Sequence, residues 1–370
     1  MKSKISQQFS TDRVFLAIIV LLTTIGVFVF ISASFGLTLE KEVWKSILIS
    51  QLILGLGMGV VFALLASVTP VSFLKKYALY LLISAIIMNL LVFVPEIGFR
   101  YGGAARWIHV FGISFQPVEF LKVALVIFLA KWLSHIKDDV KKLRYGLAPF
   151  LFILAIIAVI MISQPDTGSF IIILGTSIVM FFSAGGRLSH IASVAVGTIF
   201  LITVLAFTRP YVKSRITVFF NPSHDPSGES YQLQQSLLAV GSGELTGRGF
   251  GQSLQKFRYL PEPIGDSIFS VLGEEFGFIG TTTIVLLFIA YCLRGLRIAS
   301  RAENLFDRLL VTGLAIMVAI QAFMHIGASL GLLPLTGIPL PFISHGGSAM
   351  MFALIGAGLI INISRHKQGV

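Results

Sequence analysis

The chain changes from polar to apolar at one stretch, and that change decides how it folds: Gln255-Lys256-Phe257-Arg258-Tyr259-Leu260-Pro261-Glu262-Pro263-Ile264-Gly265-Asp266-Ser267. The stretch closes a long polar insert, residues 209–267, and an apolar segment begins directly after it. Pro261, Pro263 and Gly265 exclude a regular helix, because proline lacks a backbone N–H and glycine adds backbone freedom. The sequence therefore predicts a rigid, non-helical loop at the edge of a membrane segment.

This loop holds a carboxylate, Asp266, directly before the apolar segment, and two cations, Lys256 and Arg258, precede it. A loop of this kind at a membrane face suits chemistry on a charged head group attached to a lipid tail. The alternative is an ordinary exposed loop whose carboxylates are solvated. The loop by itself does not decide between the two interpretations.

Composition places the chain in the membrane. Of 370 residues, 55% are hydrophobic and only 12% are charged, whereas soluble domains are about 25% charged. The single cysteine, Cys292, offers neither a disulfide nor a thiolate metal site. The net charge of +11 does not indicate nucleic-acid binding, because excess Lys and Arg in a membrane protein usually lie in cytoplasmic loops.

A membrane-spanning helix needs about 20 mainly apolar residues. By this rule we expect an all-α integral membrane protein, residues 1–370 as one polytopic domain, with a large extracytoplasmic loop at 209–267 before the eighth span. The ten expected spans are 14–35, 44–66, 74–95, 117–134, 146–163, 168–184, 189–208, 268–293, 309–331 and 345–363.

Charge predicts the orientation of these spans. With both termini in the cytoplasm, the inner segments hold 17 of the 28 Lys and Arg residues, and the short outer loops hold only Lys41, Lys45, Arg100 and Arg106. Positive charge collects on the cytoplasmic side. We therefore expect a multi-pass protein of the cytoplasmic (inner) membrane with loop 209–267 facing outward.

Two features are expected within that loop. Residues Tyr231–Val240 have the spacing of a short amphipathic helix, which Gly241-Ser242-Gly243 ends. The run Gly247, Gly249 and Gly251 then predicts turns. Such a run can also cradle phosphate, but the Lys and Ser/Thr of a P-loop do not follow it.

The fourth span opens with a pair of opposite charges. Pro117 suits the first turn of a helix, so Glu119 and Lys122 lie three residues apart on one face and can pair. Ionisable groups inside a span are costly and usually serve function, although a pair that only fixes helix packing is the alternative. In the preceding outer loop, Trp107 beside Arg106 fits either an interfacial anchor or a substrate contact.

Two further outer loops carry polar groups. Asp166, in the turn 164–168, either caps the sixth helix or has a role in function. The last outer loop, 331–348, is rich in Pro and Gly, and such interrupted backbone at membrane depth occurs where it lines a cavity or is buried in protein. His345 in that loop fits a packed histidine as well as a functional one. The seven histidines show no metal-ligand spacing, so no built-in metal site is expected.

Taken together, these motifs resemble the SEDS family of cell-shape and division proteins, and the branch they resemble most is FtsW rather than RodA. The matching runs extend from about residue 100 to 350: Ala105-Arg106-Trp107-Ile108, Phe115-Gln116-Pro117-x-Glu119-Phe120-x-Lys122, Gln164-Pro165-Asp166-x-Gly168, Asn221-Pro222-x-x-Asp225-Pro226, Tyr231-Gln232-x-x-Gln235-Ser236, Gly241-Ser242-Gly243, Gln255-Lys256-x-x-Tyr259-Leu260-Pro261-Glu262, Gly273-Glu274-Glu275-x-Gly277 and Gly331–Gly347.

The chain departs from the family pattern in two places. It has Ile264-Gly265-Asp266-Ser267 where the family usually has His-Thr-Asp-Phe, and Ser344-His345-Gly346-Gly347 where the family has Ser-Tyr-Gly-Gly. The aspartate is kept, whereas its immediate neighbours differ. The departures bear on loop geometry and rate more than on identity.

The resemblance implies a peptidoglycan glycosyltransferase that polymerises lipid II at the outer face of the membrane. It implies a class b penicillin-binding protein as partner, with its single helix against the eighth and ninth spans, and other division or elongation proteins. By residue match Asp266 takes the position of the catalytic aspartate. The other substrate-binding residues expected are Arg106, Trp107, Gln116, Glu119, Lys122, Asp166, Lys256, Arg258, Glu262 and Ser344.

The chemistry of the reaction agrees with this assignment. A carboxylate can act as general base on the attacking sugar hydroxyl, and cations or a divalent metal such as Mg²⁺ can stabilise the departing pyrophosphate. Arg106, Lys122, Lys256 and Arg258 are the candidate cations, and no tightly bound cofactor is expected. An apolar groove between spans would hold the polyprenyl tails.

Two other functions remain open from the sequence. A flippase of the lipid-linked precursor would show repeated halves and charges near the bilayer midplane, but this chain has its ionisable residues in outer loops and first helical turns. A non-catalytic scaffold for a penicillin-binding protein is favoured by the altered neighbours of Asp266. Elongation of lipid II by the purified protein distinguishes the enzyme from both.

Overall fold

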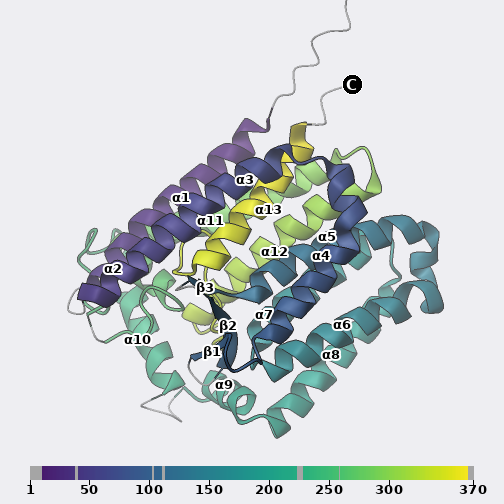
Figure 1. Cartoon of the computed structure of the whole chain (residues 1–370). Helices are drawn as coiled ribbons and strands as arrows, with labels where there is room; N and C mark the ends of the chain where they lie inside the picture. Colours follow the sequence, from purple (N-terminus) through teal and green to yellow (C-terminus); the bar gives the residue numbers. More distant parts are fainter. Residues whose placement is uncertain are drawn as a thin grey trace, which may run out of the picture.

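Long apolar helices make up most of the structure (Figure 1). A computed structural model of the chain describes residues 11–37, 41–101, 104–110, 113–222, 228–257 and 259–365. The long helices are α1 (Arg13–Ser34), α2 (Lys41–Ile49), which continues through a π-helical segment, Ser50–Gly57, into α3 (Met58–Val68), α4 (Val71–Leu91), α5 (Pro117–Ile136), α6 (Ala148–Ser163), α7 (Thr167–Ser183), α8 (Leu188–Thr208), α11 (Ile268–Ser300), α12 (Leu305–Ser329) and α13 (Gly347–Arg365).

The prediction of an all-α membrane protein is confirmed. Each expected span coincides with a helix, and eight helices of the described chain are long and apolar enough to cross a membrane. The other two expected spans are α7, which is short at 17 residues, and α5, which carries Glu119, Lys122 and Lys131. The α2–α3 segment forms one span over Trp44–Val68.

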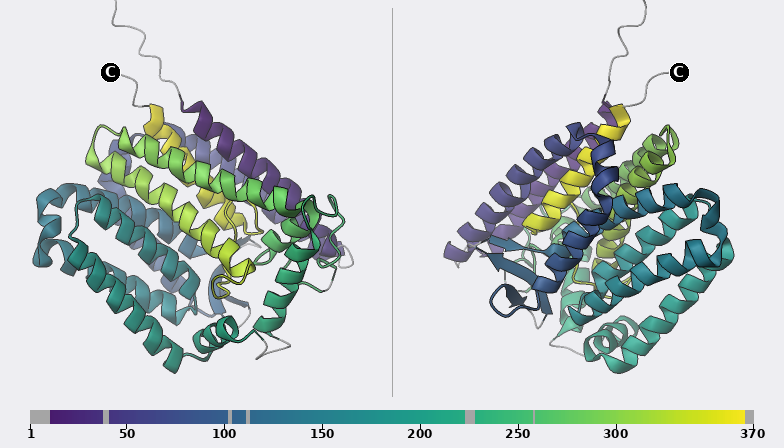
Figure 2. Two further views of the ribbon diagram at one scale, coloured as in Figure 1. Left: turned by 180° about the vertical axis from the view of Figure 1, so that it is seen from behind. Right: turned by 45° about the vertical axis from the view of Figure 1, so that its right-hand side comes forward.

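The helices differ in how deeply they lie in the bundle. Helix α12 is the central one, buried along nearly its whole length, and it packs against α5, α7, α11 and α13. Helix α8 has the opposite character, with only Val194 and Leu205 buried, and it lies at the periphery beside α7 and α9 (Figure 2). An apolar helix whose side chains are mostly exposed must face lipid.

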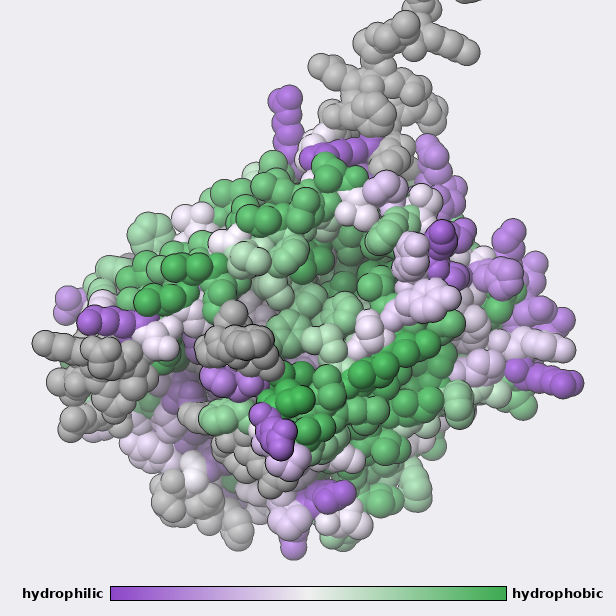
Figure 3. Space-filling model, in the orientation of Figure 1, coloured by the Kyte–Doolittle hydropathy of each residue, from purple (hydrophilic) through white to green (hydrophobic). Residues whose placement is uncertain are grey.

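The surface has the distribution of polarity that a bilayer requires. On the face drawn in Figure 3, apolar side chains cover the area over α1, α3 and α4, and hydrophilic side chains gather toward its margins. The exposed apolar side chains of these three helices include Val20, Val60, Leu64, Ile83 and Ile87. Soluble monomers rarely expose contiguous apolar patches of this extent.

The polar segments gather at one end of the bundle (Figure 1). They include α9 (Pro210–Phe220), α10 (Glu229–Ser242) and an antiparallel sheet of β1 (Gly98–Tyr101), β2 (Ala104–Val110) and β3 (Ile113–Phe115) in the order β1-β2-β3. Helix α10 confirms the predicted amphipathic helix, whereas the sheet and α9 were not predicted. Helix α1 begins and α13 ends at the opposite end of the bundle.

Helix α11 is interrupted near its start, where Gly277 has φ 61° and ψ −159°. The glycine run at 247–251 packs on this break: the amides of Arg248 and Gly249 donate to the carbonyls of Glu274 and Glu275, at 3.0 and 2.9 Å. The three glycines of the run all have positive φ, as tight turns require. The run therefore serves as a turn that docks on α11.

Candidate functional site

The loop before α11 is non-helical, as its prolines and glycine predict. The amides of Gly265 and Ser267 both donate to the Glu262 carbonyl, at 3.1 Å each, which closes a tight turn around Asp266. Glu262 itself has a positive φ of 48°. The turn thus holds Asp266 at the start of α11, outside the membrane-spanning helix.

The loop between α12 and α13 holds this turn in place. His345 N donates to Ile264 O at 2.7 Å, and Ser344 Oγ donates to Gly265 O at 2.9 Å. Gln51 holds the same loop from the other side. Its Nε2 donates to Ser344 O at 3.1 Å, and its Oε1 accepts from Gly346 N at 2.9 Å. The two departures from the SEDS pattern are therefore in direct contact with each other.

Gly337 marks the point where the charged groups converge. A β-carbon at this position would lie 3.3 Å from Arg215 Nη2, 3.5 Å from Asp266 Oδ2 and 3.9 Å from Arg106 Nη1. Gly337 also has a φ of +67°, which favours glycine. Four segments that are far apart in sequence thus bring one carboxylate and two guanidinium groups around the same point.

Arg215 is held by α9 and its neighbours. Its Nη1 donates to Thr336 O at 3.0 Å, and its Nε lies 3.4 Å from Glu229 Oε1 at the start of α10. These contacts fix the guanidinium beside Asp266 without using all of its donors. Sequence reasoning missed Arg215, which is one of six cations in the polar insert and belongs to none of the quoted motifs.

Arg106 extends from β2 to the turn between α6 and α7. Its Nε donates to Gln164 O at 3.5 Å and its Nη2 donates to Pro165 O, while Gln164 Nε2 donates to Asn89 O at 2.8 Å. In the same turn Asp166 Oδ1 accepts the Ser169 amide at 3.2 Å, so Asp166 does cap α7. The second oxygen of Asp166 is buried without a hydrogen-bond partner in the described structure.

The surroundings of Asp266 raise the pKa of its carboxyl to about 6. Removal from water is the largest cause and the charge of Glu262 the next, since both disfavour the ionised form. Arg215 and Arg106 act in the opposite direction, and Asp166 raises the pKa further. A carboxyl with this pKa is ionised at neutral pH and is a stronger base than an ordinary aspartate.

A small cavity of about 40 Å³ opens beside Asp266 and Arg215. Its lining includes His325 of α12, whose Nδ1 lies 2.8 Å from Ile338 O. That contact requires the proton on Nδ1, which leaves Nε2 as an acceptor, and Nε2 is buried without a partner in the described structure. His325 is a second residue that sequence reasoning missed, because a histidine in an apolar helix is usually a packed core residue.

The expected Glu119–Lys122 pair forms, with Lys122 Nζ 2.9 Å from Glu119 Oε1, and both side chains are buried. Lys122 Nζ also donates to Gln321 Oε1 at 2.6 Å, and Gln321 Nε2 donates to Pro339 O at 2.9 Å. The pair thus ties α5 to α12 and to the loop that carries Gly337. Its side chains line a separate cavity from that of Asp266.

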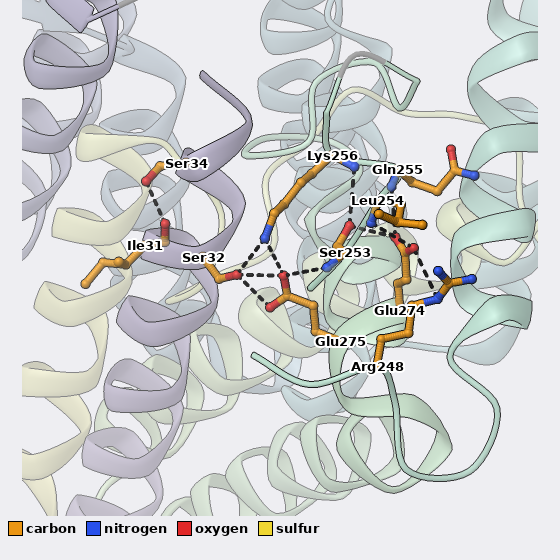
Figure 4. A network of polar contacts seen from close by, with 10 residues as sticks. All are labelled: Ile31, Ser32, Ser34, Arg248, Ser253, Leu254, Gln255, Lys256, Glu274 and Glu275. Atoms are coloured by element: carbon orange, nitrogen blue, oxygen red, sulfur yellow. Dashed lines mark hydrogen bonds and ion pairs between the residues drawn. The ribbon is translucent and has the colours of Figure 1, made fainter. Parts of the chain in front are cut away.

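Lys256 lies in a different cluster, drawn in Figure 4. Its Nζ is 2.6 Å from Glu275 Oε1 and 3.1 Å from Ser32 Oγ, and Lys256 is only 1% exposed. Next to it Glu274 accepts from Ser253 Oγ at 2.6 Å and from the amides of Leu254 and Gln255. These contacts hold α1, the loop 253–256 and α11 together.

The remaining expected residues are placed as follows. Trp107 is partly exposed in β2, opposite Phe99, and Glu262 is exposed beside Asp266. Gln116 is buried directly before α5, where its backbone N–H donates to Ser348 Oγ at 3.1 Å. Arg258 lies outside the described residues.

The side chains of the site can be compared with the ligands that a divalent cation needs. Among the described residues, His, Cys, Asp and Glu form no group of three or more that could hold a metal. Mg²⁺ is commonly bound by one or two carboxylates together with substrate phosphates. The oxygen of Asp166 that is buried without a partner in the described structure is a donor of the kind that such a shared site uses.

Relatives of known name cover the whole chain. Stage V sporulation protein E of Bacillus subtilis (strain 168) is 38% identical over 363 residues, 98% of this chain and 99% of the relative. A probable peptidoglycan glycosyltransferase FtsW of Geobacter sp. (strain M18) is also 38% identical over 363 residues, 97% of this chain and 98% of the relative.

Solved structures share the fold. A chain from a peptidoglycan synthase complex that coordinates polymerization and crosslinking is 24% identical with a TM-score of 0.79, and covers 96% of this chain and 98% of its own length. The rod shape determining protein RodA of Thermus thermophilus is 24% identical with a TM-score of 0.71, over 99% of this chain and 100% of its own. The family model of the FtsW, RodA and SpoVE cell cycle proteins matches residues 12–369, and this chain therefore belongs to that family.

Proposed function

We propose that this protein polymerises lipid II into glycan strands at the outer face of the cytoplasmic membrane, in cell division or cell-wall elongation. The observation that carries the proposal is the convergence of Asp266, Arg106 and Arg215 around Gly337. A family relative named as a probable peptidoglycan glycosyltransferase matches nearly the full chain, which supports the same reaction.

In this mechanism Asp266 accepts the proton of the attacking sugar hydroxyl. The hydroxyl oxygen forms a bond to the anomeric carbon of the second sugar, and the bond from that carbon to the lipid pyrophosphate breaks. A base with a pKa of about 6 is ionised at neutral pH and takes up the proton more readily than an ordinary aspartate.

Arg106 and Arg215 balance the charge that develops on the departing pyrophosphate. Preorganised cations at the site of developing charge are worth several kcal/mol of barrier in a site that excludes water, and both guanidinium groups are anchored by backbone carbonyls. Lys256 and Lys122 are left out of this assignment, because their ammonium groups are bonded to buried carboxylates. If Mg²⁺ takes part, Asp166 would hold it with the substrate's phosphates, and it would add positive charge there, which leaves Asp266 free to act as the base.

The size of the cavity limits what reaches Asp266. A volume of about 40 Å³ has room for a few water-sized groups, which fits a sugar hydroxyl. The sugar rings therefore bind at the mouth of the cavity, among the exposed faces of the outer loops. Trp107, which is partly exposed, and Glu262 are the expected residues that lie on such faces.

We also propose a class b penicillin-binding protein as partner, through the outward face of α11. Leu286 and Leu293 on α11 are 58% and 62% exposed, whereas residues 309–320 of α12 are almost entirely buried. Because other helices cover most of this part of the ninth span, the portion of the expected contact that the bundle leaves exposed lies on α11. Photocrosslinkers at Leu286 and Leu293 should capture the partner's helix, and crosslinks restricted to α4 and α8 would exclude this arrangement.

Orientation is testable with single cysteines. Ser223, a natural choice within the polar insert, lies outside the described residues, whereas Thr246 is exposed at the polar end and Ser300 at the opposite end. In a background with Cys292→Ser, an impermeant thiol reagent should label Thr246→Cys on intact cells and Ser300→Cys only after lysis. The reverse pattern would overturn the proposed topology.

The function itself is tested with the purified protein and its partner. Labelled lipid II should be lengthened into glycan chains when the partner's crosslinking site is blocked. A flippase would instead move labelled precursor across vesicle membranes without chain growth, and a scaffold would do neither. Chain growth that depends on this protein decides among the three functions.

A further inference from the structure

A long apolar groove lies between α1, α3 and α13, which run side by side (Figure 1). Its volume is about 560 Å³, and its walls include Leu16, Val20, Val60 and Leu64, which are 42–63% exposed. Helix α3 packs closely along α13, whereas α1 packs mainly on α11, and this division leaves the groove between α1 and α3.

The groove has the dimensions of one hydrocarbon chain. Its lining on the N-terminal segment extends from Thr11 to Phe28, about 25 Å at 1.5 Å per residue. A groove of this length, with about 560 Å³ of space and mostly apolar walls, suits one hydrocarbon chain. In a membrane such a groove is filled by lipid, because its walls offer few polar groups.

One end of the groove is cationic. Arg365, the last residue of α13, donates from Nε to Thr11 Oγ1 at 3.1 Å and from Nη1 to Ser67 O at 3.3 Å. Both acceptors are uncharged, and among the described residues no ion pair includes Arg365. The adjacent carboxylate, Asp12, is paired instead with Arg294 at 2.9 Å.

We propose that this groove binds an anionic glycerophospholipid, with its phosphate on Arg365 and one acyl chain between α1 and α3. The cationic end lies at the end of the bundle where α1 begins and α13 ends, opposite the loops that carry Asp266 (Figure 1). With the proposed orientation this is the cytoplasmic leaflet, where anionic head groups attract juxtamembrane cations.

The position of Arg365 also separates this lipid from the substrate. A lipid-linked sugar reacting at Asp266 has its head group at the other end of the bundle, so Arg365 would gain no partner from it. The bound phospholipid would join α1 to α3 and α13 at the face where these helices leave a gap. The proposal rests on the orientation of the chain and not on the polymerase reaction.

The test uses the whole protein in phosphatidylcholine vesicles that contain a phosphatidylglycerol with a photoactivatable acyl chain. Crosslinked peptides should map to 16–28 of α1 and to α3, and phosphatidylcholine with the same chain should label them much less. Arg365→Gln should lower this labelling about fivefold, the effect of losing one cation at a lipid surface. Arg301→Gln, an exposed cation at the same end, should leave it unchanged.

A second pair of variants tests the groove without touching the charge. Val20→Trp fills the groove and should abolish labelling, whereas Leu21→Trp adds the same bulk to a side chain that is 50% exposed and outside it. Equal labelling by both phospholipids, or labelling that survives Arg365→Gln, would overturn the proposal. Displacement of the probe by equimolar polyprenyl phosphate would assign the groove to the substrate's tail instead.

Discussion

Lys256→Met separates a structural role for this lysine from a role in substrate binding. Lys256 and Glu275 are both about 1% exposed, and the ammonium lies 2.6 Å from the carboxylate (Figure 4). The substitution leaves Glu275 buried with Ser32 as its remaining side-chain partner, because Ser32 Oγ donates at 2.6 Å. Removing one member of a buried ion pair typically costs about 3–5 kcal/mol, since the other charge is left without its counterion.

The assay is thermal unfolding in detergent, with glycan-chain formation measured on the same preparation. A loss of about 3–5 kcal/mol should lower the Tm by roughly 10 °C. Lys256→Met/Glu275→Gln removes the orphan charge as well and should recover part of that loss. Lys213→Met, at an exposed cation on α9, is the matched control and should leave the Tm unchanged.

One result would contradict the structural role of Lys256. A Lys256→Met protein that keeps the wild-type Tm within about 2 °C and yet loses polymerisation would return Lys256 to the substrate site. In that case the contacts of Lys256 with Glu275 and Ser32 would not be needed to hold α1 and α11 together.

Three further predictions concern the groups around Asp266. Glu262→Gln removes a charge that raises the Asp266 pKa, so the acid limb of the polymerisation rate, which falls through about pH 6, should move to lower pH. Arg215→Gln removes a charge that lowers this pKa and should move the limb to higher pH; limbs that shift in the same direction would contradict the arrangement. Gly337→Ala places a methyl group among these groups at a φ of +67° and should cost about 1–2 kcal/mol of stability together with most of the activity, read from the Tm and the rate. Full activity in that variant would show that the convergence is not needed.

The membrane architecture follows from the sequence because each span is a local property. Twenty apolar residues define a helix without reference to the rest of the chain, and the ten expected spans coincide with observed helices. The Glu119–Lys122 pair and the Asp166 cap are also local, since both depend on residues three apart on one helix. Such features are set by helical geometry and were predicted for that reason.

The composition of the site was only partly predictable, because it depends on contacts between distant segments. Arg215, Gly337 and Asp266 are separated by 50 residues or more, and no periodicity relates them. Lys256 precedes Asp266 by ten residues, yet it turns inward to Glu275 of α11 instead. Charge at the membrane edge indicates where a site is, whereas packing decides which cations enter it.

The contact between the two departures from the SEDS pattern could not be predicted either. His345 donates its amide to Ile264, and its ring stacks on Phe30 at 6.0 Å. Burial lowers the pKa of His345 to about 4, so the ring is neutral at neutral pH. The altered residues Ile264 and His345 therefore pack against each other, while the Asp266 carboxylate lies near Gly337.

Asp266→Asn tests the central claim most directly, because it removes the base while preserving the shape of the side chain. Because the pKa of Asp266 is raised, its ionised form is less favourable in the folded protein than in the unfolded chain. The difference is at most about 3 kcal/mol for a shift of about 2 units, and it is smaller after solvent screening. The neutral amide should therefore leave the Tm at pH 7.5 unchanged or slightly higher.

The measurement is glycan-chain formation from labelled lipid II by Asp266→Asn and wild type, with lipid II binding and the Tm recorded on the same samples. Loss of a general base should slow polymerisation by roughly 10²–10⁴-fold, about 3–5 kcal/mol of barrier, while binding and Tm are retained. Polymerisation within a few-fold of wild type would remove Asp266 from the mechanism, and a parallel fall in Tm and rate would make its role structural.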